Sequence, residues 1–390
     1  MLRKIKNFIH LCLAILANLW YGFPGRKIKV IGITGTDGKT TTSHLIYEIL
    51  KNAGKKVSLV STVYAKIGSQ EFDTGLHTTT PSCFLIQKLL KMAVDNKDEY
   101  FVLETTSHGL DQNRTWGINY EAGLITNVTH EHLDYHCSFN SYLKTKARLL
   151  LNANVSFINK DDSSYEQLEK ILKANHKKIF SYSVKNQADY HQDFNNLKQE
   201  IADYNCHNFL AAYSVCNYLG ISEDSIFATL KKFQLPPGRL ETVFNKKFKI
   251  IVDFAHTPNA IDALLQYVRK QTAGRLIHIF GSAGLRDASK RPLMGEASSK
   301  YSDVIILTEE DYRTEDPQKI AASIALGISK NIPYEIILNR EEAIKKALAI
   351  AKEKDVIVIT GKAHEQSLCR GKIEYPWNDI QAVKRLTQDL

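Results

Sequence analysis

The segment VIGITGTDGKTTT (residues 30–42) ends like a loop that binds the phosphates of a nucleotide. In such a loop Lys39 can reach the terminal phosphates, and the Thr40 hydroxyl can bind Mg²⁺. The usual pattern has a glycine where Ile33 stands here, so the segment is either a different subtype of nucleotide site or a glycine-rich turn. A plain turn does not require lysine and threonine at the start of a helix. We therefore favour a nucleotide site.

Two later segments contain candidate metal ligands. ETTSHGLDQNR (Glu104–Arg114) begins at the end of an apolar, strand-like segment. In open α/β sheets, ligands bind at the carboxyl ends of the strands, so Glu104 is well placed to bind Mg²⁺. NVTHEHLDYH (Asn127–His136) also follows a strand-like segment and is rich in histidine. The histidine spacing is not a zinc signature, and any one of these histidines alone would be a hydrogen-bonded structural residue.

The elements that position these residues alternate between strand-like and helix-like segments. A helix is predicted over residues 40–53, and strands over residues 29–34, 56–62, 100–104, 122–128, 155–159 and 178–184. The sequence QLPPGRLE interrupts the series, and further strands are predicted over residues 250–254, 275–280, 303–308 and 355–360. Alternation of this kind predicts mostly parallel sheets covered by helices on both faces.

We therefore predict an α/β fold in three parts. Residues 1–26 form an apolar helical segment, residues 27–235 a phosphate-loop domain with a mostly parallel sheet, and residues 236–390 a Rossmann-like α/β domain. The boundary is placed near Leu235 because two prolines and a glycine follow it.

The composition is that of an ordinary folded protein, with 44% hydrophobic and 24% charged residues. The net charge of +9 suggests an anionic partner such as a nucleotide, an acidic small molecule or a membrane surface. The lysines form no long basic run, which argues against nucleic acid. The six cysteines form no CxxC pair, so neither a zinc ribbon nor a disulfide framework is expected, and the cytoplasm is the default location.

The N-terminal segment has three basic residues followed by an apolar run from Phe8 to Tyr21. The run is short for a membrane span, His10 and Asn18 interrupt it, and no small-x-small cleavage site follows. We expect an amphipathic helix packed on the first domain. Attachment of residues 8–21 to the inner face of the membrane is the alternative.

Taken together, the motifs resemble those of the Mur ligase family of peptidoglycan synthesis, and within it the MurE-type UDP-N-acetylmuramoyl-tripeptide synthetases. The family's ATP loop is TGTNGKTT, without the Walker glycine, and TGTDGKTT stands here. Over residues 27–377 the matching segments are HTTTP, ETTSHGLDQNR, HEHLDYH, YLKTKARLL, YNCHN, PGRLE, VDFAHTPNAI and GSAGLRDASKRPLMG. The resemblance implies an enzyme that uses ATP and Mg²⁺ to form an amide bond through an acyl phosphate. We expect it to be a monomer.

The resemblance also assigns roles to residues. Those implied at the ATP site are Gly35, Thr36, Asp37, Gly38, Lys39, Thr40, Thr41, Asn205, Asn208, Arg239, Asp253 and His256. Those implied to bind the muramoyl-peptide or the incoming amino acid are Thr79, Thr80, Thr106, Gln112, Arg114, Arg286, Asp311, Arg313, Gly361 and Glu365. The implied catalytic residues are Lys39, Glu104, His132 and Lys146, and the implied metal ligands are Thr40, Glu104, His132 and Lys146.

Lys146 matches a lysine that the family carries as a carbamate. An ammonium beside Mg²⁺ would be repelled, whereas addition of CO₂ turns the side chain into an anionic oxygen ligand. The alternative for Lys146 is an ordinary surface lysine on a helix.

The match is looser where the amino acid is selected. Family members that add meso-diaminopimelate have DNPR before TEDP, and EDYR (residues 310–313) stands here. Arg313 is retained and could pair with a distal carboxylate, whereas a carboxylate at Asp311 would suit a cationic amine. Ala363 in GKAHE replaces a glycine, and Thr106 replaces a serine. We expect a diamino acid, with diaminopimelate ahead of lysine or ornithine.

Full-length family members carry an N-terminal domain that binds the uridine diphosphate of the substrate. Lys39 lies too near the start of this sequence to leave room for that domain, so a lipid-linked or other acceptor is an alternative. A folylpolyglutamate synthetase shares the loop, but Thr79, Thr80 and HLDYH favour the muramoyl ligase. A lipid-II amidating subunit would have a cysteine cluster, and a non-enzymatic ATP-binding subunit would have lost phosphate or metal residues.

Overall fold

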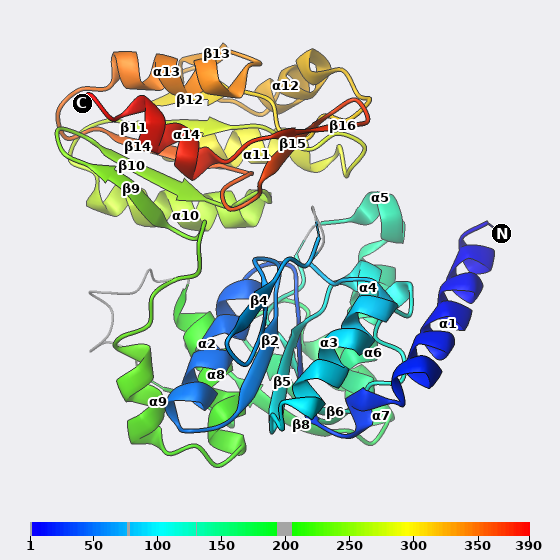
Figure 1. Cartoon of the computed structure of the whole chain (residues 1–390). Coiled ribbons are helices and arrows are strands. Elements are labelled where there is room, and N and C mark those ends of the chain that lie inside the picture. The colour runs from blue at the N-terminus through cyan, green and yellow to red at the C-terminus, as the bar shows by residue number, and fades with distance from the viewer. Residues whose placement is uncertain (1, 76–78, 130, 193–204) are drawn as a thin grey trace. The chain divides into compact units, whose positions relative to one another are not determined.

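The computed structural model describes residues 2–75, 79–129, 131–192 and 205–390. His77, Thr78, His130 and Tyr204, which belong to motifs quoted above, lie outside the described residues. The chain divides into two compact units (Figure 1). Unit 1 comprises residues 1–129 and 138–234, and unit 2 comprises residues 130–137 and 235–390.

Unit 1 is built on an eight-stranded sheet in the order β4-β3-β2-β5-β1-β6-β7-β8. The strands are β1 (Lys29–Thr34), β2 (Val57–Val60), β3 (Ala65–Ile67), β4 (Gln70–Phe72), β5 (Tyr100–Glu104), β6 (Tyr120–Ile125), β7 (Ala153–Asn159) and β8 (Lys178–Tyr182). The pairs β2–β5, β5–β1, β1–β6, β6–β7 and β7–β8 are parallel, and β3 and β4 are antiparallel at one edge. Their central strands are apolar on both faces, as expected for a parallel sheet covered on two sides.

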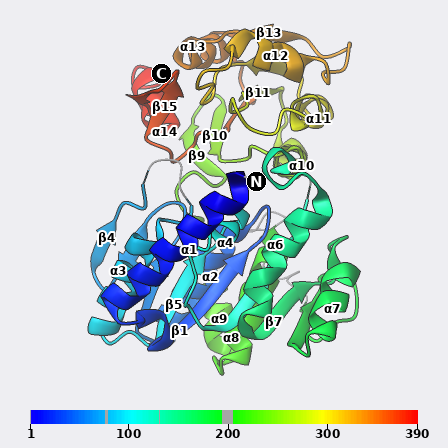
Figure 2. The same ribbon diagram turned by 90° about the vertical axis from the view of Figure 1, so that its right-hand side faces the viewer.

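Two layers of helices bury this sheet (Figure 2). One apolar core joins the sheet to α2 (Lys39–Asn52), α8 (Asn205–Tyr218) and α9 (Glu223–Leu230). The other core joins it to α3 (Cys83–Asp95), α6 (Phe139–Leu151) and α7 (Tyr165–Ala174). A short helix, α4 (Ser107–Asp111), follows β5.

The expected N-terminal helix is present. It is α1 (Leu2–Tyr21), which packs on α3 and is followed by the 3-10 turn η1 (Pro24–Arg26). Among the helices of the described residues, none is both long enough and apolar enough to cross a membrane.

Unit 2 has a six-stranded sheet in the order β13-β12-β11-β14-β10-β9, in which β9 is antiparallel to β10. The strands are β9 (Glu241–Asn245), β10 (Lys249–Asp253), β11 (Leu276–Phe280), β12 (Val304–Leu307), β13 (Tyr334–Ile336) and β14 (Val356–Thr360). One face packs on α10 (Pro258–Gln271), α11 (Lys290–Ser299) and α12 (Pro317–Ala325). The other face packs on α13 (Arg340–Ile350) and α14 (Asp379–Leu386). A hairpin of β15 (Ser367–Arg370) and β16 (Ile373–Pro376) and the short α5 (Leu133–His136) complete unit 2.

The predicted α/β class with a mostly parallel sheet is confirmed. Each predicted strand has an observed counterpart, although several limits differ by a few residues; the strand predicted over residues 122–128, for example, is β6 and ends at Ile125. The prediction missed the strands β3, β4, β9, β13, β15 and β16. These strands are short and lie at sheet edges or in hairpins, where the apolar alternation that identifies buried strands is weak.

Candidate functional site

The phosphate-binding loop connects β1 to α2, and two of its glycines are required by close contacts. Gly35 and Gly38 have φ angles of 146° and 81°, which favour glycine. A Cβ at Gly35 would lie 1.8 Å from Thr126 Oγ1, and one at Gly38 would lie 2.2 Å from Asn208 Oδ1. The loop can therefore follow this path only with glycine at both positions.

Polar groups hold the loop in place. The backbone amides of Thr36 and Asp37 donate to Asn127 Oδ1 at 3.2 and 2.9 Å. At the N-terminus of α2, Lys39 Nζ donates to Thr36 O at 2.7 Å, and Thr41 is buried in the first turn. The start of a helix favours anions, so the loop and Lys39 form a suitable cradle for phosphates.

Glu104 lies at the end of β5, which is paired with β1, and its side chain is 1% exposed. Its Oε1 accepts hydrogen bonds from the hydroxyls of Thr40 at 3.0 Å and Thr62 at 2.9 Å, and its Oε2 accepts one from the Thr62 amide at 2.9 Å. A carboxylate and a hydroxyl are oxygen ligands of the kind that Mg²⁺ prefers. Thr40 and Glu104 therefore fit a magnesium site beside the loop.

The residues predicted to bind the muramoyl-peptide lie together next to Glu104. Thr80 Oγ1 accepts from the Thr106 amide at 2.8 Å and lies 3.1 Å from the Thr106 hydroxyl. Arg114 donates to the carbonyl oxygen of Thr80 and, through Nε and Nη2, to Gln112 Oε1 at 2.9 and 2.7 Å.

Two further contacts complete this cluster. Thr62 Oγ1 also lies within hydrogen-bond distance of Thr79 Oγ1, at 3.0 Å, and so connects Thr79 to Glu104. Thr106 is also the N-cap of α4, because its hydroxyl accepts from the Gly109 amide at 3.1 Å. The hydroxyl that replaces the family's serine therefore still caps the helix.

Lys146 lies on α6 and is 1% exposed. Its amine donates to the carbonyl oxygen of Gly35 in the phosphate loop and lies 4.5 Å from the centre of the Tyr142 ring. Lys146 is thus not a surface lysine. A buried amine at the phosphate loop fits the addition of CO₂, which would replace a cation by an anionic oxygen ligand at the place where metal and phosphate would bind.

Asn205 and Asn208, which were predicted at the ATP site, lie at the start of α8 and are buried. Asn208 Nδ2 donates to Asn205 Oδ1 at 2.9 Å, and Asn208 Oδ1 accepts from the Thr42 hydroxyl at 3.4 Å. Asn208 also lies against Gly38, so this pair is directly beside the phosphate loop.

Three residues predicted at the ATP site belong to unit 2 and surround Phe254 at the end of β10. Asp253 accepts from the amides of Leu240 and Ala255, both at 2.7 Å. The Arg239 guanidinium lies 4.7 Å from the centre of the Phe254 ring, and the His256 ring lies 4.8 Å from the same ring. Unit 2 thus brings Arg239, Asp253 and His256 together.

His132 also belongs to unit 2, where it precedes α5 with a φ angle of 56°. The neighbouring Glu131 is buried and accepts a hydrogen bond from Lys290 Nζ at 3.0 Å, and Lys290 also donates to the carbonyl oxygen of His256 at 2.9 Å. The segment around His132 is therefore fixed to α11 by a buried ion pair.

Two arginines of unit 2 form a positively charged site. Arg313 has a φ angle of 52°, and its Nη1 donates to Gly284 O at 2.7 Å. A Cβ at Gly284 would lie 2.1 Å from Tyr312 O, so glycine is needed for the loop carrying Arg286 to approach Arg313. Desolvation, followed by repulsion from Arg313, lowers the pKa of Arg286, although its side chain still reaches solvent. Two neighbouring guanidinium groups suit a ligand with carboxylates.

The residues Asp311 and Glu365 are joined by Lys362, which sequence reasoning missed. Lys362 is fully buried; its Nζ donates to Asp311 Oδ1 at 2.8 Å and to Glu365 Oε2. Burial alone would lower the pKa of Lys362, but the carboxylates of Glu365 and Asp311 raise it, so the group stays charged. Asp311 Oδ1 also accepts from the Cys369 amide at 2.9 Å, so this carboxylate is already compensated within the protein.

Beside these residues Glu310 is buried. Its Oε2 lies 2.9 Å from the position of a Cβ on Gly361, whose φ angle is 105°. Burial, and then the charge of Asp311, raises the pKa of Glu310. In the same loop burial lowers the pKa of His364 to about 3, so its ring is neutral at physiological pH.

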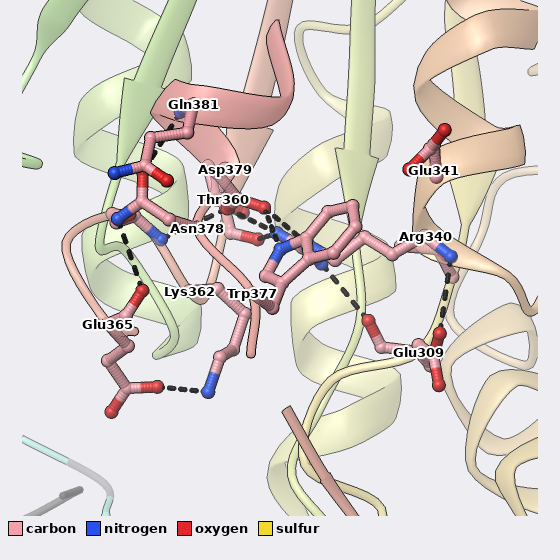
Figure 3. A network of polar contacts seen from close by, with 12 residues as sticks. Glu309, Arg340, Glu341, Thr360, Lys362, Glu365, Trp377, Asn378, Asp379 and Gln381 are labelled. Atoms are coloured by element: carbon pink, nitrogen blue, oxygen red, sulfur yellow. Dashed lines mark hydrogen bonds and ion pairs between the residues drawn. The ribbon is translucent and has the colours of Figure 1, made fainter. Parts of the chain in front are cut away.

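A second buried network holds the loop of Gly361–Glu365 (Figure 3). Arg340 is fully buried and donates to both oxygens of Asp379 at 2.7 and 2.8 Å and to Thr360 O at 2.8 Å. Asp379 Oδ2 also accepts from the Ala363 amide at 3.0 Å, and its Oδ1 accepts from Trp377 Nε1 at 2.8 Å. The ion pair therefore fixes the backbone between Thr360 and Ala363.

Sequence reasoning missed Thr62, Asn127, Lys290 and Lys362 as residues that shape the site. Asn127 was visible as the first residue of NVTHEHLDYH, directly after a strand, and Lys362 as the lysine of GKAHE. Thr62 lies two residues after the end of β2 and belongs to no quoted motif. Its contact with Glu104 is visible only in the folded sheet.

A phosphate-binding loop with a buried carboxylate beside it, at the carboxyl edge of a mostly parallel sheet, defines a nucleotide-binding enzyme of the phosphate-loop class. Comparison with protein families narrows this class. Residues 33–216 match the Mur ligase middle domain, and residues 238–363 match the Mur ligase, glutamate ligase domain.

Individual relatives agree. The chain is 39% identical over 389 residues to a UDP-N-acetylmuramoyl-L-alanyl-D-glutamate--2,6-diaminopimelate ligase of Aquifex aeolicus (strain VF5), covering 95% of this chain and 80% of that protein. A solved structure of such a ligase is 29% identical, with a TM-score of 0.60, and covers 93% of this chain and 78% of that one. Folylpolyglutamate synthase of Mycobacterium tuberculosis has a TM-score of 0.73 at 16% identity, covering 96% and 94%, and shows a shared fold only. The chain belongs to the Mur ligase family, as its motifs predicted.

Proposed function

We propose that this chain is an ATP-dependent, ADP-forming ligase of peptidoglycan precursor synthesis. It joins the carboxylate of a muramoyl-peptide resembling UDP-MurNAc-L-Ala-D-Glu to the amine of a diamino acid. The names of the relatives support this substrate pair, because they specify UDP-N-acetylmuramoyl-L-alanyl-D-glutamate and 2,6-diaminopimelate. The observation that carries the proposal is the cluster in unit 1, where the phosphate loop, Glu104, buried Lys146 and the Thr80–Arg114 contact lie at one sheet edge.

Each group of that cluster has a proposed role in the first step. Lys39 and the loop amides bind and orient the γ-phosphate of ATP. Thr40, Glu104, His132 and Lys146 as its carbamate would hold Mg²⁺, which supplies positive charge to the phosphate oxygens. Arg114 positions the acceptor carboxylate, which attacks the γ-phosphorus in line and forms an acyl phosphate and ADP.

In the second step the amine of the incoming amino acid attacks the acyl phosphate, and phosphate leaves. We assign the amino acid to unit 2, where Arg286 and Arg313 would bind its carboxylates. Because Asp311 is already paired with Lys362, we propose that it positions Lys362 and Glu365 instead of binding an amine. Two arginines and a compensated Asp311 favour diaminopimelate, which has two carboxylates, over lysine or ornithine.

We keep residues 27–235 and 236–390 as the proposed limits of the ATP-binding and amino-acid-binding domains. We also propose that the protein acts in the cytoplasm as a monomer. The main alternative to this function is a ligase of the same chemistry whose acceptor is lipid-linked.

The test is phosphate release from ATP by the purified full chain with UDP-muramoyl-dipeptide as acceptor and diaminopimelate, lysine or ornithine in turn. We expect release with diaminopimelate and at least about tenfold less with the others, because loss of one charged hydrogen bond costs about 1.5–3 kcal/mol. Release that requires neither acceptor nor amino acid would contradict the ligase. Release only with a lipid-linked muramoyl-peptide would establish the alternative acceptor.

A further inference from the structure

The helix α1 packs on α3 of unit 1 (Figure 2). The buried side chains on its inward face are small or polar. Ala14 and Ala17 are fully buried in a small cluster with Cys83 and Trp116. Asn18 is also buried, and its Nδ2 donates to Trp116 O at 2.8 Å.

Contacts near both ends of α1 fix it in this orientation. Near the N-terminal end, Arg3 and Asn7 donate to Asp111 Oδ2 at 3.1 and 2.9 Å. Near the C-terminal end, Asn18 lies so close to Gly117 that a Cβ there would be 2.5 Å from its Oδ1. These specific contacts define which face of α1 is turned inward.

Most of the large apolar side chains of α1 point the other way, while Leu11 and Ile15 are half-buried. Six of them, each between 52% and 80% exposed, are Ile5, Phe8, Ile9, Leu16, Leu19 and Trp20. With 3.6 residues per turn, these positions lie on the side opposite Ala14, Ala17 and Asn18. The amphipathic helix expected from the sequence is thus present, but its apolar face is turned toward solvent. A contiguous exposed apolar face of this kind marks an interaction surface.

The charges around this face identify its partner. Residues 1–36 contain no aspartate or glutamate and six basic residues, which are Arg3, Lys4, Lys6, Arg26, Lys27 and Lys29. Apart from Arg3, which is paired with Asp111, these side chains are exposed. Lys4 and Lys6 lie near the N-terminal end of α1, and Arg26, Lys27 and Lys29 follow its C-terminal end in the chain. A second copy of the same face would bring positive charges against positive charges in either orientation. The surface of a bilayer with anionic lipids matches both the apolar face and the basic ends.

We propose that α1 docks unit 1 on an anionic lipid bilayer, lying in the plane of the boundary between headgroups and acyl chains. Phe8, Leu16 and Trp20 enter the acyl region, and Lys4, Lys6 and Arg26 contact lipid phosphates. This surface is independent of the proposed ligase activity.

The test is sedimentation of the full chain with vesicles of phosphatidylcholine alone or of phosphatidylcholine mixed with phosphatidylglycerol. We expect binding to the mixed vesicles at least about tenfold stronger than to phosphatidylcholine, and weaker binding at high salt. The triple change Phe8→Ser, Leu16→Ser and Trp20→Ser should reduce binding at least about tenfold. These side chains are exposed, so circular dichroism and thermal unfolding should show an intact fold.

Two further variants test the basic residues of this surface and control for the loss of an exposed apolar side chain elsewhere. Lys4→Glu with Lys6→Glu should weaken binding to the mixed vesicles and reduce its salt dependence. Leu326→Ser, which removes a side chain that is 81% exposed in unit 2, should leave binding unchanged. Failure to bind the mixed vesicles, or binding that survives the triple change, would overturn the proposal. So would a dimer in sedimentation velocity that the triple change dissociates.

Discussion

At the scale of single residues, the amine of Lys146 illustrates how burial narrows the choice of chemistry. It lies beside Gly35 O in the phosphate loop, and Tyr142 covers it. The sequence YLKTKARLL contains two lysines, and only the fold separates them: Lys144 is exposed, whereas Lys146 is 1% exposed. The resemblance to the family selected Lys146, while the residue types alone favoured an ordinary surface lysine.

Lys144 and Lys146 provide a matched test of the carbamate. We predict that Lys146→Ala lowers the ligase kcat by about 10³-fold or more and that added acetate restores part of it, because a free carboxylate can replace the missing oxygen ligand. Lys144→Ala, on the solvent side of the same helix, should retain full activity. Phosphate release with and without acetate measures both variants. Full activity of Lys146→Ala would rule out the carbamate.

The role of Arg313 can be tested in the same assay. We predict that Arg313→Met raises the KM for diaminopimelate about 10–100-fold, because it removes a charge-assisted pair with a carboxylate. The KM for ATP should not change, because the proposed nucleotide loop lies in unit 1. Arg313→Lys, which keeps the charge but loses the planar fork, should fall between wild type and Arg313→Met. An unchanged KM for diaminopimelate in both variants would remove Arg313 from the site.

At the scale of secondary structure, the chain shows which elements a sequence can reveal. The strands β1, β5 and β14 are apolar on both faces, and their patterns are strong enough to be recognised without a structure. The hairpin strand β16 is exposed throughout, and β4 is half exposed, so neither has such a pattern. The orientation of α1 is likewise hidden from the sequence. Periodicity shows that a helix is amphipathic, but it does not show which side packs on the protein.

The buried ion pair that fixes α13 to α14 is a second feature hidden from the sequence. Arg340 and Asp379 are both 0% exposed. We predict that Arg340→Met lowers the free energy of unfolding of unit 2 by about 3–5 kcal/mol, because it leaves a buried carboxylate without its cation. Combining Arg340→Met with Asp379→Leu should recover part of this loss. Urea unfolding of the three proteins measures the effect, and an equally severe loss in the double variant would contradict this explanation.

His278 on β11 makes the stability of unit 2 depend on pH. Its ring is fully buried between Ser298 and Thr360, and burial lowers its pKa from 6.5 to about 3. Between these values the unfolded chain binds a proton that the folded chain does not, so the free energy of unfolding falls as the pH falls. We predict that wild type loses about 1.5 kcal/mol more than His278→Gln between pH 6.5 and pH 5.

Urea unfolding of the transition of unit 2 at the two pH values measures this difference. His176→Asn is the control, because His176 is exposed and asparagine tolerates its positive φ angle of 53°. The control should show the same pH dependence of the free energy of unfolding as wild type. If His278→Gln also showed it, groups other than His278 would cause the pH dependence.

At the scale of the whole molecule, the residues that the structure describes form two sets of apolar cores, and the two units share no core residue. The cores around β1 and β5 belong to unit 1, and those around β10 and β14 belong to unit 2. The sequence indicated this division through the prolines and glycine of QLPPGRLE. It could not indicate that the segment 130–137, which carries His132, groups with unit 2, because that grouping depends on the contact between Glu131 and Lys290, far apart in the sequence.

Separate cores predict separate unfolding and separate responses to the two ligands. In calorimetry of the full chain we expect two transitions. ATP with Mg²⁺ at about 100 times its Kd should stabilise the transition of unit 1 by about 2.7 kcal/mol, and diaminopimelate should shift the transition of unit 2. Lys39→Ala should abolish the shift caused by ATP and leave the shift caused by diaminopimelate intact. Arg313→Met should abolish the shift caused by diaminopimelate and leave the shift caused by ATP intact. A single transition that either ligand shifts equally would contradict this prediction, because it would show that the two units unfold together. Binding of ATP or of the amino acid would then stabilise both units of the folded protein.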